Sequence, residues 1–189
     1  MELTLKKELF EQEFFKNTFK QKLNGAKQYD FNSQATFTDL EAKYYYYGRA
    51  VKGTLADMGA LAYFMSQDIP YKYYEKNGGR GKYVGYDFKL YDKIKVDVRS
   101  SQSFWQMKKS NVDYIVVCTA HLNGMDGVYE KAGATLVESY RRLFKNDIRV
   151  TLLGYQTAQF IQEAGPLAFT YKLENIDTLK ADLNLMNQL

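Results

Sequence analysis

The chain has 189 residues, of which 46% are hydrophobic, and a formal net charge of +4. This length and composition exclude an intrinsically disordered chain and allow a sizeable core. One cysteine excludes an internal disulfide framework and indicates a reducing, cytoplasmic compartment, while one histidine argues against zinc sites with several His or Cys ligands. No run approaches the roughly 20 apolar residues of a membrane span, and MELTLKKELFEQEFF lacks the apolar centre of a signal peptide, so no membrane partner is expected.

An amphipathic helix is predicted over residues 5–23, because apolar residues recur there at helical spacing and Asn24-Gly25 follows. These residues are Leu5, Leu9, Phe10, Phe14, Phe19 and Leu23. Such an aromatic surface is unfavourable in water. We therefore interpret residues 1–43 as an N-terminal helical arm that packs either on the core or on a second copy of the chain, as in a homodimer.

A second helix is predicted to open near Thr38, because Glu41 follows three residues later as in a capping box. It continues through the long apolar stretch that follows, with an interruption expected near Gly48 or Gly53. Asp57 lies inside this apolar stretch. An acid in such surroundings indicates either a ligand or a local salt bridge.

Five strands are predicted after the second helix, at residues 71–76, 83–91, 93–101, 112–120 and 148–154. Asp92 separates the second strand from the third, which predicts an antiparallel hairpin. The strand at 112–120 is the most hydrophobic and is expected to be central, with Cys118 buried and inert. Helices are expected at residues 134–144 and 157–164, and a loop or short helix at 103–110. This order predicts an α/β fold, a mixed β-sheet flanked by helices, for residues 44–189.

The positive charge is concentrated in residues 76–109, which carry nine Lys or Arg residues against three Asp residues. Such a surface is typical of proteins that bind a polyanion, so nucleic acid is the expected partner, with DNA favoured over RNA. A set of ordinary solvated faces is the alternative. The candidate nucleic-acid-binding residues are Lys82, Lys89, Lys93, Ser101 and Gln102.

The predicted hairpin carries a charged constellation. Asp87 lies in its first strand and Asp97 in its second, so the two carboxylates are expected near each other across the ladder. Carboxylate oxygens are ligands that Mg²⁺ prefers. Lys95 and Arg99 share the face of Asp97 and could hold a phosphate or stabilise its developing charge. The alternative for Arg99 is a salt bridge to one of the two acids.

The segment GYDF, followed by VDVRSS, resembles the PD-(D/E)xK nuclease superfamily, which has the restriction-endonuclease-like fold. The resemblance spans residues 48–165 and includes an acid on the preceding helix, Asp57, one turn after a glycine. It implies a metal-dependent nuclease that hydrolyses phosphodiester bonds with Mg²⁺ or Mn²⁺. The metal ligands would be Asp57, Asp87 and Asp97, and the catalytic residues Asp87, Asp97, Arg99 and Lys95. We expect the three acids to converge on one divalent ion.

Two residues depart from the family pattern. Arg99 stands where the family has lysine, and Asp57 is shorter than the family's helix glutamate. Arginine stays charged and cannot manage a water proton as lysine can. Lys95 could supply that function, or the metal-bound water could need no base. The remaining alternative is a catalytically weakened or inactive nuclease-like scaffold that binds nucleic acid or inhibits a protein partner.

Overall fold

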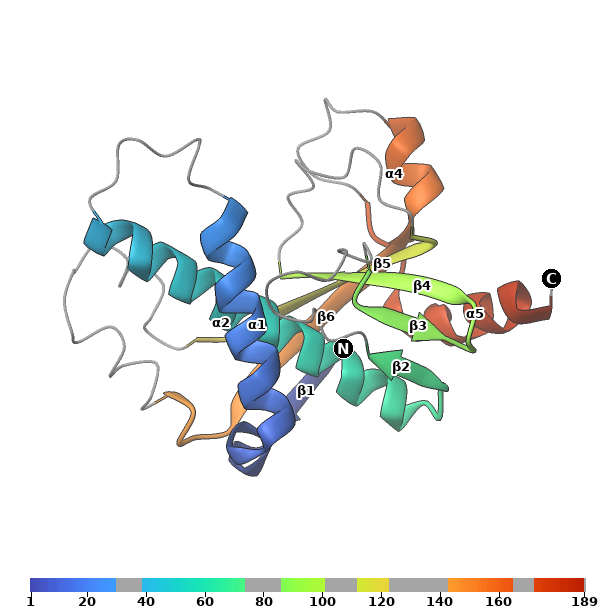
Figure 1. Ribbon diagram of the computed structural model, residues 1–189. Helices are drawn as coiled ribbons and strands as arrows, with labels where there is room; N and C mark the ends of the chain where they lie inside the picture. Colours follow the sequence, from blue (N-terminus) through green and yellow to red (C-terminus); the bar gives the residue numbers. More distant parts are fainter. Residues whose placement is uncertain (30–38, 74–85, 101–111, 123–142, 165–171, 189) are drawn as a thin grey trace.

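The computed structural model describes residues 1–29, 39–73, 86–100, 112–122, 143–164 and 172–188 (Figure 1). Its strands are β1 (Glu2–Leu5), β2 (Tyr71–Tyr73), β3 (Phe88–Leu90), β4 (Ile94–Arg99), β5 (Tyr114–Ala120) and β6 (Ile148–Thr157). Its helices are η1 (Lys7–Glu11), α1 (Glu13–Tyr29), α2 (Asp39–Ser66), α4 (Ala158–Ala164), η3 (Ile176–Thr178) and α5 (Leu179–Gln188). None of the helices in these ranges is long and apolar enough to cross a membrane.

The strands form one mixed sheet of six strands in the order β1-β6-β5-β4-β3-β2. Only β4 and β5 run parallel; the other neighbours are antiparallel. The α/β class predicted from the sequence is confirmed, and the most hydrophobic strand, β5, lies inside the sheet between β4 and β6. The expected hairpin is also present: β3 and β4 are joined through Tyr91 and Asp92, both with positive φ, as a type I′ turn requires.

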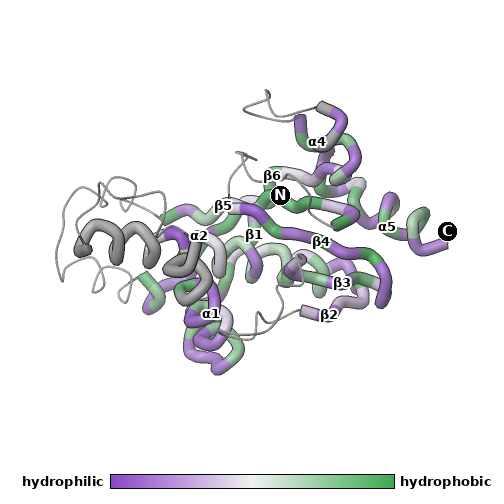
Figure 2. Tube along the Cα trace, turned by 45° about the horizontal axis from the view of Figure 1, so that its top comes forward, coloured by the Kyte–Doolittle hydropathy of each residue, from purple (hydrophilic) through white to green (hydrophobic). Residues whose placement is uncertain are grey.

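The alternating side chains of β5 serve two apolar clusters. Val116 and Cys118 belong to the main core, which includes the buried residues of α2, whereas Ile115 and Val117 belong to a smaller cluster with α4. Figure 1 shows α1 crossing α2 on one side of the sheet and α5 beside the β3–β4 hairpin. In Figure 2 the strands in the middle of the molecule carry hydrophobic segments that alternate with hydrophilic ones.

The N-terminal segment differs from its predicted helix. Residues 2–5 form β1, which pairs antiparallel with β6, and a 3₁₀ helix precedes α1. The helical spacing of the apolar residues is overridden because the edge of β6 offers backbone hydrogen bonds and a buried place for Leu5. Phe15 of α1 is buried and stacks edge-on against Phe10 at 5.0 Å between ring centres. Residues 2–29 are therefore built into the same sheet and core as the rest of the described chain.

The second helix is continuous. The interruption expected near Gly48 or Gly53 is wrong, because α2 runs unbroken from Asp39 to Ser66. Packing of its buried face on the sheet compensates the low helix propensity of glycine. The segments predicted at 103–110 and 134–142 lie outside the described residues. The helices η3 and α5 had no counterpart in the prediction, and they pack through the buried residues Ile176, Leu179 and Leu183.

Candidate functional site

The hairpin fixes the positions of Asp87 and Asp97. Phe88 pairs with Val96, and continuing this register by one residue places Asp87 opposite Asp97. The backbone N–H of Asp87 donates to the Val96 carbonyl at 2.9 Å, and its Oδ2 accepts the N–H of Val98 at 2.9 Å. Both carboxylates are at most 3% exposed. The sequence prediction that the two acids lie close across the ladder therefore agrees with the hairpin register.

Asp57 reaches the same region from α2. Asp57 is fully buried, and its Oδ2 accepts a hydrogen bond from the Tyr73 hydroxyl of β2 at 2.8 Å. The Tyr73 ring itself packs between Phe14 of α1, at 5.3 Å, and Phe88 of β3, at 4.9 Å. A helix and two strands thus hold this carboxylate in one orientation. Of the two explanations that the sequence leaves open for Asp57, the local salt bridge is present, and its partner is Lys22.

Lys22 of α1 joins the acids. Its Nζ lies 2.9 Å from Oδ1 and 2.7 Å from Oδ2 of Asp57, and 3.4 Å from Oδ1 of Asp87. The Lys22 side chain is only 15% exposed. Sequence reasoning missed this residue, because nothing in the pattern of α1 separates Lys22 from the other lysines of that helix. The sequence gives one indirect signal. An acid inside an apolar helix, such as Asp57, requires a cation partner, but the sequence does not show which lysine or arginine that partner is.

Asp97 is paired with the second cation of the cluster, the Arg99 guanidinium. Arg99 Nη2 lies 2.5 Å from Asp97 Oδ2, so the salt-bridge alternative for Arg99 is realised. Asp97 Oδ2 nevertheless accepts no aligned hydrogen bond, and Arg99 Nε has no acceptor, within the described residues. The Arg99 side chain is 33% exposed. A buried oxygen with unused accepting capacity is the kind of atom that a further donor or a cation can satisfy.

Burial shifts the pKa values of these groups. Burial raises the pKa of Asp57 to about 6, although the Lys22 ammonium opposes the shift. Burial, with the negative charge of Asp87 beside it, raises the pKa of Asp97 to about 7 against the effect of Arg99. For Lys22, burial alone would lower the pKa, but Asp57 and Asp87 outweigh it and raise the pKa far above its usual value. The lysine therefore stays protonated, and the carboxyls compete for positive charge.

The chemistry of the donor set suits a divalent cation, because it contains three carboxyls. Two of the carboxyls already hold a cation, the Lys22 ammonium. In the described part of the chain, however, no three His, Cys, Asp or Glu side chains are arranged to hold a metal ion. Asp57 and Asp87 share the ammonium, while Asp97 adjoins Asp87 on the side of Arg99. The carboxyls suit a divalent ion by chemistry, but convergence of all three on one ion is not shown in the described structure, where the Lys22 ammonium contacts Asp57 and Asp87.

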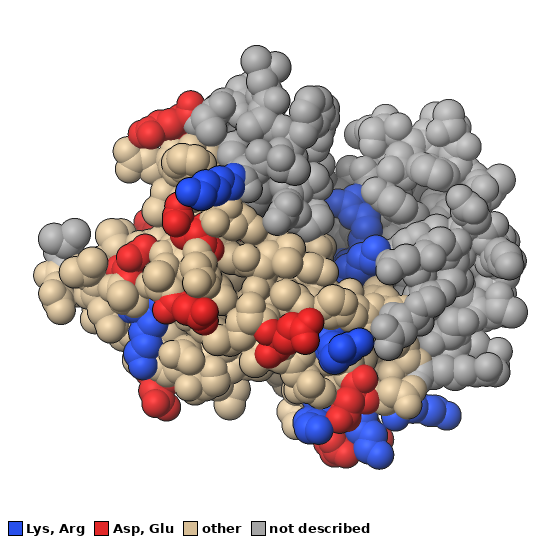
Figure 3. Space-filling view, turned by 180° about the vertical axis from the view of Figure 1, so that it is seen from behind, with Lys and Arg blue, Asp and Glu red and all other residues tan. Residues whose placement is uncertain are grey.

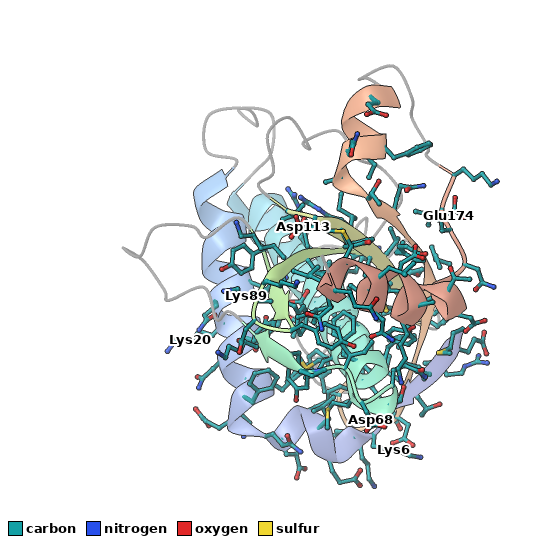
Figure 4. The ribbon with its side chains drawn as sticks, turned by 90° about the vertical axis from the view of Figure 1, so that its right-hand side faces the viewer. Lys6, Lys20, Asp68, Lys89, Asp113 and Glu174 are labelled. Carbon is teal, nitrogen blue, oxygen red and sulfur yellow. The ribbon has the colours of Figure 1, made fainter. Side chains whose placement is uncertain are left out.

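The predicted basic residues are distributed around the hairpin. Lys95 places its ammonium 5.8 Å from the ring centre of Tyr86, and Lys89 faces Lys95 across the ladder at the position labelled in Figure 4. Lys93 Nζ donates to the Asn187 carbonyl of α5 at 2.6 Å. The candidates Lys82, Ser101 and Gln102 lie outside the described residues. On the face seen from behind the view of Figure 1, positive and negative side chains are interspersed (Figure 3).

Comparisons with protein-family models, with curated proteins and with solved structures found no match. The candidate site is the acidic cluster, formed by Lys22, Asp57, Asp87, Asp97 and Arg99.

Proposed function

We propose that the protein is a metal-dependent nuclease that hydrolyses phosphodiester bonds, with DNA as its expected substrate. The observation that carries the proposal is the acidic cluster. Three carboxyls from α2, the start of β3 and β4 are buried together, and in the described part of the chain they are paired with Lys22 and Arg99. Burying charge in this way costs free energy that apolar residues would not cost, so stability alone is a poor reason for it. Perturbed acids gathered in one place are typical of functional sites.

The elements that meet in the cluster support the same conclusion. The resemblance to the PD-(D/E)xK superfamily rested on two acids in a strand hairpin and one acid on the preceding helix. Lys22 of α1 links α2 to the hairpin, because its ammonium contacts both Asp57 and Asp87, and the hairpin register places Asp87 opposite Asp97. A restriction-endonuclease-like fold is the finer form of the α/β architecture that this arrangement favours.

The residues that would hold Mg²⁺ or Mn²⁺ are Asp57, Asp87 and Asp97. Such an ion supplies positive charge to the phosphate and makes water a stronger nucleophile. The chain's own cations have a different part. Arg99, whose side chain is one third exposed, is the cation that could contact a phosphate oxygen, and it stays charged throughout. Neither Arg99 nor the protonated Lys22 can take up a proton, so proton transfer belongs to a carboxylate or to solvent.

The test is nicking of supercoiled plasmid with Mg²⁺ or Mn²⁺, with EDTA as the control. We expect cleavage by the wild type only when metal is present, and none by Asp87→Asn, which loses a charged oxygen while keeping the side-chain shape. Asp92→Asn is the matched control: it makes the same change in the exposed turn of the same hairpin, where asparagine tolerates the positive φ. Equal cleavage by wild type and Asp87→Asn would contradict the proposal.

A second function is favoured by one observation. The Lys22 ammonium already contacts Asp57 and Asp87, so both carboxyls have a cation partner without a metal. A nuclease-like scaffold that binds nucleic acid without turnover would have this property. Retention of plasmid in a gel-shift assay, with no nicking in Mg²⁺ or Mn²⁺, would select this function.

A further inference from the structure

The position of Lys22 has a consequence for any cation that enters the cluster. Its Nζ contacts both oxygens of Asp57 and one oxygen of Asp87, within 2.7 to 3.4 Å. A divalent ion bound to the same oxygens would lie about 2.0–2.6 Å from them. Two cations cannot occupy positions defined by the same carboxylate oxygens, because they would lie almost in contact and repel each other. Binding of the ion and the present position of the ammonium therefore exclude each other.

The surroundings of Lys22 allow it to leave. Its ammonium is on a four-carbon stem with several rotatable bonds, and 15% of the side chain is exposed to solvent. The stem lies beside α2, where a Cβ on Gly53 would come to 3.5 Å from Lys22 Cδ, an ordinary van der Waals contact. The helix that carries it is held independently by Phe15, which is buried in the core. Lys22 can thus change its rotamer while α1 stays in place.

We propose that Lys22 is the resident cation of the acidic cluster and that a divalent ion binds by displacing its ammonium from Asp57 and Asp87. This inference rests on the proposed function, since it concerns the same site. Without the ion, the Lys22 ammonium occupies the site. The ion binds when it displaces this ammonium from the carboxylates. The affinity for the ion is reduced by the free energy of displacing the ammonium, as for any ligand whose binding-competent state is only partly populated.

The experiment compares Mn²⁺ binding by calorimetry for the wild type and for Lys22→Met, which keeps the length of the stem and removes the charge. We expect Lys22→Met to bind Mn²⁺ at least about tenfold more tightly, which corresponds to about 1.4 kcal/mol. The matched control is Lys20→Met on the same helix, since Lys20 is exposed and projects away from the core (Figure 4). Its Mn²⁺ affinity should equal that of the wild type.

Two further variants keep the test decisive if Lys22→Met folds poorly, as loss of a buried cation makes plausible. Lys22→Arg retains the charge and holds carboxylates more firmly through its planar fork, so it should weaken Mn²⁺ binding. The rise in melting temperature on adding Mn²⁺ should be largest for Lys22→Met and smallest for Lys22→Arg.

The outcomes separate this inference from the proposed function. Mn²⁺ binding that is lost in Asp87→Asn, but equal or weaker in Lys22→Met than in the wild type, would overturn the displacement and leave the metal site standing. No Mn²⁺ binding by the wild type or by any Lys22 variant would overturn both. Tighter binding in Lys22→Met, with no nicking by any variant, would support the displacement and contradict the nuclease.

Discussion

A single buried carboxyl shows how the cluster depends on its surroundings. Asp97 is 3% exposed, adjoins the negative Asp87 and is paired with the Arg99 guanidinium. Burial and the neighbouring charge raise its pKa to about 7, so the folded protein holds this proton far more tightly than the unfolded chain, in which an aspartate titrates near 3.8. Between these two values the native state binds more protons, so stability falls as the pH rises. Asp57, with a pKa raised to about 6, acts in the same direction.

This residue therefore gives a prediction on pH. In EDTA, the melting temperature of the wild type should fall as the pH rises from about 5 to 8, and Asp97→Asn should melt higher at pH 8 with a flatter pH profile. The expected gain is a few degrees, since 1 kcal/mol shifts the midpoint of a domain of this size by about 2–4 °C. The measurement is differential scanning calorimetry, with Asp92→Asn as the exposed control. Parallel pH profiles for wild type and Asp97→Asn would show that this carboxyl is already ionised at neutral pH.

At the scale of elements, α2 packs closely against the central strands. A Cβ added to Gly59 of α2 would lie 2.4 Å from the Sγ of Cys118 on β5 and 3.1 Å from Cγ2 of Val150 on β6. Glycine at this position lets the helix approach the sheet, which brings Asp57, two residues earlier, within reach of the hairpin. The same packing raises the pKa of the buried Cys118 thiol to about 12, consistent with the prediction of an inert thiol.

Gly59→Ala should therefore be destabilising by about 1–3 kcal/mol, because overpacking outweighs the gain in helix propensity. The matched control is Gly53→Ala on the same helix, where the added Cβ would meet only the Lys22 stem at 3.5 Å. That change should stabilise the protein by up to about 1 kcal/mol. Urea unfolding of the three proteins measures both effects. A Gly59→Ala protein as stable as Gly53→Ala would mean that α2 can move away from the sheet without loss.

The sequence could predict those parts of the fold that depend on local signals. The β3–β4 hairpin, the central strand and the long helix all have a clear hydrophobic period or turn. Asp57 could be named because it is an acid in an apolar helix, and Asp87 and Asp97 because they lie in the two strands of a hairpin that resembles a nuclease motif. Strand β1 could not be predicted, since four residues form a strand only where β6 offers an edge. Lys22 could not be predicted either, because its contacts depend on how α1 crosses α2.

At the scale of the whole molecule, one edge of the sheet joins β1, near the start of the sequence, to β6, from its last third. Glu2 pairs with Thr151 and Leu5 with Ile148, so β1 covers the edge of β6. Asp147 anchors the turn that follows β1, accepting from the Lys6 ammonium and from the N–H of Lys7, each at 2.9 Å. β6 is the longest strand of the described structure. Without β1, it would become an exposed edge, which is a template for association with other chains.

Deleting residues 1–5 should therefore lower the melting temperature by more than about 5 °C and produce concentration-dependent association. The deletion removes the buried Leu5, worth about 2–5 kcal/mol on truncation, and uncovers the hydrogen-bonding groups of β6. The control is Thr4→Ala, an exposed position that leaves the strand in place and should change little. Light scattering and calorimetry measure both effects.

Any monomer of the deleted protein should bind Mn²⁺ as the wild type does, because Phe15 and the contacts between α1 and α2 hold Lys22 without help from β1. A deleted protein that stays monomeric with an unchanged melting temperature would show that β1 is dispensable for the sheet, whereas an altered Mn²⁺ affinity would show that the edge strand and the acidic cluster are coupled.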